Sequence, residues 1–246
     1  NLALAYDWLL PLGATGLTAL GTGMIYLLSR KAKRSSGAVL CFAVIGLLLS
    51  GWLWYERYQE QIRYDSYFLS SPNQEETFLL KRDTRTGQTD YFRKRFWILM
   101  QKKDELPNAV QGTPKFQWLT EDVCAVTYEG KDDGAMHQFV ATFGDRSSGS
   151  YYYVLSALYG TWSGQEAGTE DWNIIADNNG ITLKVGSQPE ERYALEDCVQ
   201  FGTTALVLCR GGLPRWTIAL NTDCSIPSGF GQIAPGGTIT LSQVSM

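Results

Sequence analysis

The 246-residue sequence contains a single histidine, His137, and no C-x-x-C cysteine spacing. A catalytic arrangement built on histidine would therefore have to use His137, and the cysteines match no zinc-site pattern. The G-x-S-x-G turn that carries many hydrolase nucleophiles is also absent. These absences favour a binding role over catalysis, and we expect neither a metal nor another cofactor.

Charge is missing from two long stretches, residues 8–28 and 37–55. As helices with a rise of about 1.5 Å per residue, each would be roughly 30 Å long, the thickness of the hydrocarbon core of a bilayer. A pair of buried helices in a soluble protein is disfavoured, because two such stretches flank a short charged connector. We therefore expect residues 1–55 to form a transmembrane hairpin with two spans.

The connector, residues 29–36, gathers four cations: Arg30, Lys31, Lys33 and Arg34. Cations close to the ends of membrane spans are retained on the cytoplasmic side. The connector is therefore expected in the cytoplasm, and both termini are expected outside it. This predicts a two-span protein of the cell membrane with membrane lipid as its first partner.

Small residues recur at a spacing of four within each span. Ala19 and Gly23 form such a pair in the first span, and Gly46 and Ser50 form one in the second. Small residues at this spacing allow the backbones of membrane helices to approach closely. We expect these four positions to pack within the hairpin or against another membrane protein.

After the spans, residues 56–66 continue the helical pattern and predict a stalk. Residues 67–246 then predict an extracytoplasmic antiparallel β domain, because aromatic and β-branched runs alternate with turn residues. The hairpins follow one another without helical crossovers, which favours a sandwich or a barrel, with a propeller-like fold as the alternative. Strands are expected near 77–82, 90–100, 116–119, 123–128, 137–143, 150–158, 172–176, 181–185, 192–195, 198–209, 215–220 and 238–244.

The expected outer region is acidic, since residues 65–246 carry 15 Lys and Arg against 22 Asp and Glu. A net-acidic extracytoplasmic domain is a poor binder of nucleic acid, so none is expected as a partner. A local basic cluster interrupts this acidity. Contact of the cluster with lipid headgroups or with an acidic surface of a partner is the functional alternative to plain solvation; its members are Arg93, Lys94, Arg95, Lys102 and Lys103.

Four of the five cysteines lie in the region placed outside the membrane, where disulfides persist. If a hairpin turns near residue 212, Cys198 and Cys224 fall opposite each other. We expect a disulfide between them that closes the open end of this hairpin. Cys124 and Cys209 would then be core thiols or a second bridge.

Aromatic side chains are the candidates for contact with a ligand or partner: Tyr151, Tyr153, Trp162 and Trp172. Such rings stack on sugars and are enriched in protein interfaces. We expect a membrane-anchored binding protein, a subunit or sensor of a cell-envelope complex, with protein partners in the membrane or envelope. A glycan- or small-ligand-binding barrel is one alternative.

The other alternative is an extracytoplasmic hydrolase acting on wall polymers or peptides. It would use His137 with one of the acidic pairs, which sit at expected strand ends or turns. Those pairs are Glu121–Asp122, Asp132–Asp133, Glu170–Asp171 and Glu196–Asp197.

Overall fold

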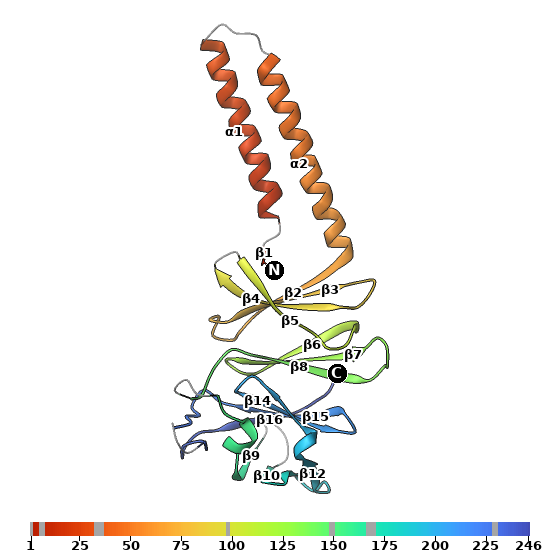
Figure 1. Cartoon of the computed structure of the whole chain (residues 1–246), viewed down its shortest axis with the longest axis vertical. Coiled ribbons are helices and arrows are strands. Elements are labelled where there is room, and N and C mark those ends of the chain that lie inside the picture. The colour runs from red at the N-terminus through yellow and green to blue at the C-terminus, as the bar shows by residue number, and fades with distance from the viewer. Residues whose placement is uncertain are drawn as a thin grey trace. The chain divides into compact units, whose positions relative to one another are not determined.

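The computed structural model describes residues 2–4, 8–31, 37–96, 99–147, 151–165, 171–227 and 231–246. The chain divides into two compact units. Unit 1 comprises Asn1–Phe68 and Phe78–Glu105, and unit 2 comprises Leu69–Thr77 and Leu106–Met246. The structure contains two long apolar helices and four mostly antiparallel sheets (Figure 1). Within the described part of the chain no sheet closes into a barrel, so that part of the expectation is wrong.

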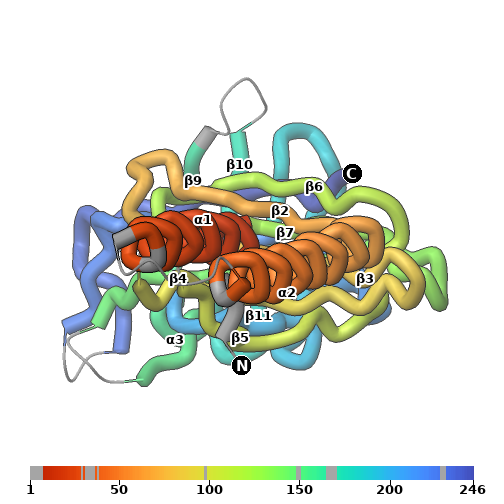
Figure 2. Tube along the Cα trace, turned by 90° about the horizontal axis from the view of Figure 1, so that it is seen from above, coloured from red at the N-terminus to blue at the C-terminus, as the bar shows by residue number. Residues whose placement is uncertain are grey.

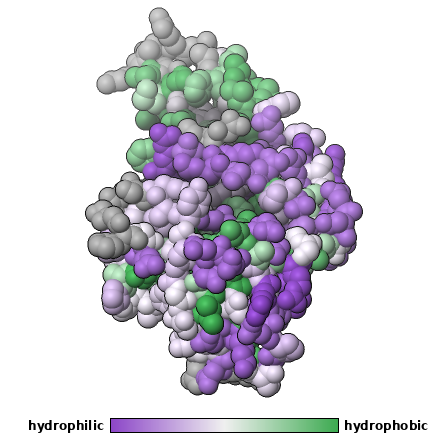
Figure 3. All heavy atoms as spheres, turned by 60° about the horizontal axis from the view of Figure 1, so that its bottom comes forward, coloured by the Kyte–Doolittle hydropathy of each residue, from purple (hydrophilic) through white to green (hydrophobic). Residues whose placement is uncertain are grey.

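The two helices of unit 1 are α1 (Leu9–Lys31) and α2 (Gly37–Arg63). Both are long and apolar enough to cross a membrane, and only 6% of each apolar window is buried within the protein. Leu17 and Leu20 on α1 are 72% and 75% exposed, and Leu48 on α2 is 69% exposed. Figure 3 shows apolar side chains on the visible part of the helices and mostly hydrophilic ones on the visible β surface.

The helices lie side by side as an antiparallel pair (Figures 1 and 2). Their close approach depends on glycine, because a Cβ at Gly46 would lie 2.2 Å from Cγ2 of Thr18 and one at Gly21 would lie 2.7 Å from the Phe42 ring. Beside these contacts, the hydroxyls of Thr18 and the buried Ser50 are 3.5 Å apart. The shared surface therefore combines small and hydroxyl side chains, as in many membrane helix pairs, with the Phe42 ring seated against Gly21.

A five-stranded sheet completes unit 1, in the order β1-β5-β4-β3-β2. Its strands are β1 (Leu2–Leu4), β2 (Tyr64–Ser70), β3 (Thr77–Asp83), β4 (Thr89–Phe96) and β5 (Leu99–Glu105). Helix α2 ends at Arg63, three residues before the end expected for the stalk, and β2 begins at the next residue. The segment 90–100, expected as one strand, is divided between β4 and β5.

Unit 2 contains three sheets, with strand orders β6-β7-β8, β12-β11-β10-β9 and β13-β14-β15-β16. The first sheet comprises β6 (Val110–Thr120), β7 (Val123–Gly130) and β8 (Met136–Thr142). The second comprises β9 (Gly160–Gln165), β10 (Asp171–Asp177), β11 (Gly180–Val185) and β12 (Glu191–Ala194). The third comprises β13 (Cys198–Phe201), β14 (Ala205–Arg210), β15 (Leu213–Leu220) and β16 (Ile239–Gln243). Two short helical turns are α3 (Val154–Ala157) and η1 (Leu195–Asp197).

The β13–β16 sheet is covered on both faces. Leu206 and Leu208 of β14 pack in a core with residues of β10, β11 and β12. The intervening residues of β14, Ala205 and Val207, pack in a second core with Val123 of β7 and with β8. Because successive side chains of a strand point to opposite faces, a strand buried on both faces is apolar along its buried length, as β14 is from residue 205 to residue 209. The sheets of unit 2 therefore stack in layers, unlike the radial blades of a propeller.

Of the segment 150–158, expected as a strand, residue 150 lies outside the described residues, and residues 151–153 form an irregular stretch followed by α3. A side chain replaces the strand partner there. The Gln200 amide accepts a hydrogen bond from Val154 N at 2.9 Å and donates one to the Tyr152 carbonyl at 3.2 Å. The backbone polar groups are thereby satisfied without a neighbouring strand.

The expected disulfide between Cys198 and Cys224 is not formed, and all five cysteines are free. The segment 198–209 reverses direction at Gly202, which has a φ of +55°, and so forms two strands, β13 and β14. Cys198 consequently pairs with Leu208 on one side of β14, while β15 pairs on the other side. The Cys224 thiol instead donates to the Thr238 carbonyl at 2.9 Å.

Candidate functional site

An exposed pair of tyrosines is the surface of unit 2 best suited to contact another molecule. Tyr151 and Tyr153 are 69% and 67% exposed, and their ring centroids are 5.6 Å apart in an edge-to-face arrangement. Tyr152 between them is buried, and its hydroxyl donates to the Thr203 carbonyl. The structure thus brings two of the four predicted aromatic contact residues together. We call Tyr151 and Tyr153 the tyrosine pair.

Gln200 of β13 fixes the backbone that carries the tyrosine pair. Besides its two bonds to the segment 152–154, its amide nitrogen lies 3.2 Å from the Tyr151 hydroxyl and 2.8 Å from the Gly202 carbonyl. Rigid aromatic side chains lose little conformational entropy when a partner binds, which favours them in interfaces. The pair is therefore held in place before any partner arrives.

The other two predicted aromatics lie elsewhere. Trp172 of β10 is only 7% exposed and belongs to the main core of unit 2. Trp162 of β9 is half-buried against that core, and its indole N–H donates to the Leu158 carbonyl at 2.7 Å. Trp172 also lines one side of an open hollow of about 690 Å³ with Ser163, Asn173 and other polar residues. Neither tryptophan joins the tyrosine pair.

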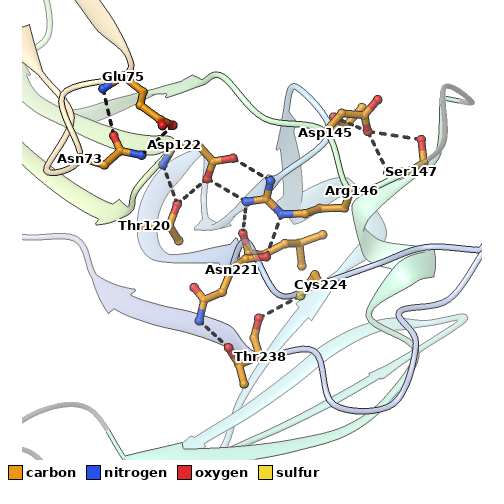
Figure 4. A network of polar contacts seen from close by, with 12 residues as sticks. Asn73, Glu75, Thr120, Asp122, Asp145, Arg146, Ser147, Asn221, Cys224 and Thr238 are labelled. Atoms are coloured by element: carbon orange, nitrogen blue, oxygen red, sulfur yellow. Dashed lines mark hydrogen bonds and ion pairs between the residues drawn. The ribbon is translucent and has the colours of Figure 1, made fainter.

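A buried arginine holds the loop that leads toward the tyrosine pair (Figure 4). Arg146 is 7% exposed and makes two parallel bonds to Asp122, at 2.6 and 2.8 Å. Two further N–H groups donate to the carbonyls of Asn221 at 2.8 Å and Leu220 at 2.7 Å. Such a bidentate arrangement fixes geometry as well as charge. Arg146 therefore ties the turn before β7 and the end of β15 to its own loop.

The electrostatics of this clamp favour ionised Asp122. Its partial burial by itself would raise the pKa of the carboxyl group. Hydrogen bonds from the Arg146 guanidinium and the Thr120 hydroxyl outweigh that effect and hold the pKa of Asp122 below its ordinary value. The pair is thus fully charged at neutral pH, as a stabilising clamp requires.

His137, the candidate for catalysis, lies in β8 and pairs with one carboxylate. Its Nε2 is 2.8 Å from Oδ2 of Asp133 in the β7–β8 turn. The hydrogen bond from the backbone N–H of Ala135 lowers the pKa of Asp133 most, and the hydrogen bond with His137 lowers it further. Among the described residues no serine, threonine or cysteine side chain is hydrogen-bonded to His137. The contact between His137 and Asp133 holds the β7–β8 turn together. Of the predicted acidic pair Glu170–Asp171, Glu170 lies outside the described residues.

The predicted membrane residues divide between two faces of the helices. Gly46 and Ser50 face α1, whereas Ala19 and Gly23 are exposed, with open space beside Gly23. Arg30 is exposed near the end of α1, and Lys31 is the last residue of that helix. The other two predicted topology determinants, Lys33 and Arg34, lie outside the described residues.

No family model matches the chain, and no curated protein or solved structure is significantly similar to it.

Proposed function

We propose that the chain is a membrane-anchored extracytoplasmic binding protein, a subunit or sensor of a cell-envelope complex. In this proposal α1 and α2 span the membrane and the connector between them is cytoplasmic. The sheet of unit 1 and the whole of unit 2 lie outside. The tyrosine pair on unit 2 contacts a protein partner.

The observation that carries the proposal is the exposure of the two helices. Soluble proteins rarely expose a continuous apolar patch larger than a few hundred Å². Here nearly the whole apolar surface of a helical pair is uncovered, with only 6% of each window buried. Lipid is the solvent in which such a surface is stable. The connector cations set the orientation by the rule that positive residues remain inside.

The tyrosine pair supports the interaction role. Interface hot spots are enriched in tyrosine and cluster on rigid, central positions. Both rings are exposed, while Gln200 and the buried Tyr152 immobilise the backbone between them. Asp145 lies nearby, with its carboxylate 3.4 Å from the Thr203 hydroxyl, and adds a polar rim. This combination of aromatic centre and polar rim is typical of protein contact surfaces.

Photo-cross-linking from the tyrosine pair tests the interaction. A photoreactive phenylalanine analogue is placed at Tyr151 or, as a control, at the exposed Ile175 of β10. Cross-linking in intact cells is expected to give one discrete protein adduct from position 151 and none of the same mass from position 175. With the probe kept at position 151, the additional Y153S change should weaken that adduct while the level of the chain in the membrane stays unchanged. Equal adducts from both positions would contradict a dedicated contact surface.

A further inference from the structure

We propose that the end of the β4–β5 hairpin binds the anionic headgroups of phospholipids in the outer leaflet. The surface, which we call the basic tip, consists of Lys94, Arg95 and Phe96 at the end of β4. The inference rests on the proposed membrane anchoring and adds a lipid class and a site to it.

The charge of the basic tip is not neutralised within the protein. Lys94 and Arg95 are exposed, and neither makes an ion pair with any described residue. The acidic partners in this hairpin lie at its other end, where Lys102 contacts Asp90 at 2.6 Å and Glu105 at 3.3 Å. From residue 91 to residue 103 the sequence contains no Asp or Glu. A concentrated positive charge therefore remains at the tip.

An exposed aromatic ring accompanies this charge. Phe96 is 65% exposed at the end of β4, beside Arg95. An exposed phenylalanine next to cations has no evident use in water, but at a bilayer surface the ring enters the headgroup boundary while the cations meet phosphates. The composition of the tip therefore matches an anionic lipid surface better than bulk solvent.

Strand pairing places the basic tip close to the start of the first span. Leu4 of β1 pairs with Leu99 of β5, and Leu99 pairs with Phe96. Adjacent strands lie about 4.8 Å apart, so Leu4 and Phe96 are separated by roughly 10 Å. Helix α1 begins at Leu9, and the five Cα–Cα steps from Leu4 to Leu9 span at most about 18 Å.

These cations do not conflict with the proposed orientation. They follow the end of α2 at Arg63 by about thirty residues, whereas the cations that set topology lie within about 15–20 residues of a span. The basic tip thus meets the outer surface only after the sheet has folded and β1 has paired with β5. Its partner there is the phosphate of an anionic lipid.

Hydrogen–deuterium exchange of the full chain in nanodiscs tests the proposal. The discs contain phosphatidylcholine alone or phosphatidylcholine mixed with phosphatidylglycerol. Exchange of amides in residues 92–101 is expected to slow severalfold in the mixed discs, and high salt should abolish the difference because it screens charge. The K94Q/R95Q variant is expected to lose the difference, while K94R/R95K should keep it. The matched control K184Q/R192Q, which removes two exposed cations of unit 2, should behave as the unaltered chain.

Each outcome has one meaning. If the amides of α1 and α2 are protected but residues 92–101 exchange equally in both discs, the lipid site is overturned and membrane anchoring stands. If protection of the tip requires an added protein rather than phosphatidylglycerol, an acidic partner surface replaces the lipid. If α1 and α2 are themselves unprotected in both discs, the anchoring and the lipid site both fail.

Discussion

At the scale of single residues, the clearest features of the molecule are side chains that replace missing backbone contacts. Gln200 supplies both a donor and an acceptor to the segment 152–154, and Arg146 gathers two carbonyls and one carboxylate. Neither role is visible in the sequence, because each depends on a partner more than forty residues away. The lone arginine in the Gly- and Ser-rich loop 144–150 was the only available signal for the clamp.

Removal of Arg146 should destabilise unit 2 strongly. The R146M variant leaves Asp122 half-buried and charged without its partner, and breaking such a pair costs about 3–5 kcal/mol. The control R192M removes an arginine whose side chain is 81% exposed in its pair with Glu190, so its cost should stay below about 1 kcal/mol. Urea unfolding of the full chain in detergent, followed by tryptophan fluorescence, measures both. Similar losses for the two variants would contradict the clamp.

The same clamp predicts a specific dependence on pH. Because the folded pKa of Asp122 is lowered, its stabilising contribution is complete above the ordinary carboxyl pKa of about 3.9 and is lost as pH falls through the lower folded value. The difference in unfolding free energy between the unaltered chain and D122N should therefore be largest at neutral pH and shrink below about pH 4. A difference that grows toward acid pH would contradict this assignment. The same unfolding experiment, repeated across pH, provides the test.

At the scale of elements, the junction between α2 and the sheet is the best-defined connection in unit 1. The N–H and hydroxyl of Thr84 donate to the Arg63 carbonyl at 2.9 and 3.0 Å, which satisfies a helix terminus. Asp83 serves both sides. Its Oδ2 accepts from Arg63 Nε at 2.9 Å, and its Oδ1 accepts from the N–H groups of Arg85 and Thr86 in the β3–β4 turn. The hydrogen bond from Arg63 lowers the pKa of Asp83 most, and the backbone hydrogen bonds from the turn lower it further.

The D83N variant should loosen this junction and leave the turn formed. The amide oxygen can still accept from the turn, but the amide NH₂ then faces the Arg63 guanidinium, which is also a donor. We expect the Thr84 amide to exchange severalfold faster with deuterium than in the unaltered chain. D90N, which alters the half-buried pair with Lys102 in the same sheet, is the control and should leave the exchange of the Thr84 amide unchanged. Unchanged exchange in D83N would show that Asp83 does not hold the helix end.

The success of sequence reasoning differs by element. Long uncharged stretches predict α1 and α2, and aromatic and β-branched runs between turn residues predict β3, β7, β10, β11 and β15, because both signals are local in the sequence. The failures lie where tertiary contacts decide. Gly202 ends a run that looks like one strand, and Gln200 converts an apparent strand at 150–158 into an irregular segment. The Cys198–Cys224 pairing failed for the first of these reasons.

At the scale of the whole molecule, composition indicated a membrane part and an antiparallel β part, and the structure contains two apolar helices and four sheets accordingly. The stacking of the three sheets in unit 2 could not be predicted from the sequence, because contacts between residues far apart in the chain decide which sheet covers which face. Of the candidate site, the sequence identified Tyr151 and Tyr153. It also suggested Trp162 and Trp172, but Trp172 shares the inward face of β10 with Ile174 and Ala176, and Trp162 packs against the same core.

Labelling of whole cells with a membrane-impermeant maleimide tests the central claim most directly. One cysteine is introduced at the exposed Ser187 of unit 2 and another, in a separate variant, at Ser36 in the connector. The native thiols of the β units should interfere little, because burial raises the pKa of Cys124 and Cys198 to about 12 and that of Cys224 to about 11. S187C should be labelled in intact cells and S36C only after the membrane is permeabilised. Labelling of S36C but not S187C in intact cells, or recovery of the chain without detergent, would contradict the membrane hairpin and its orientation.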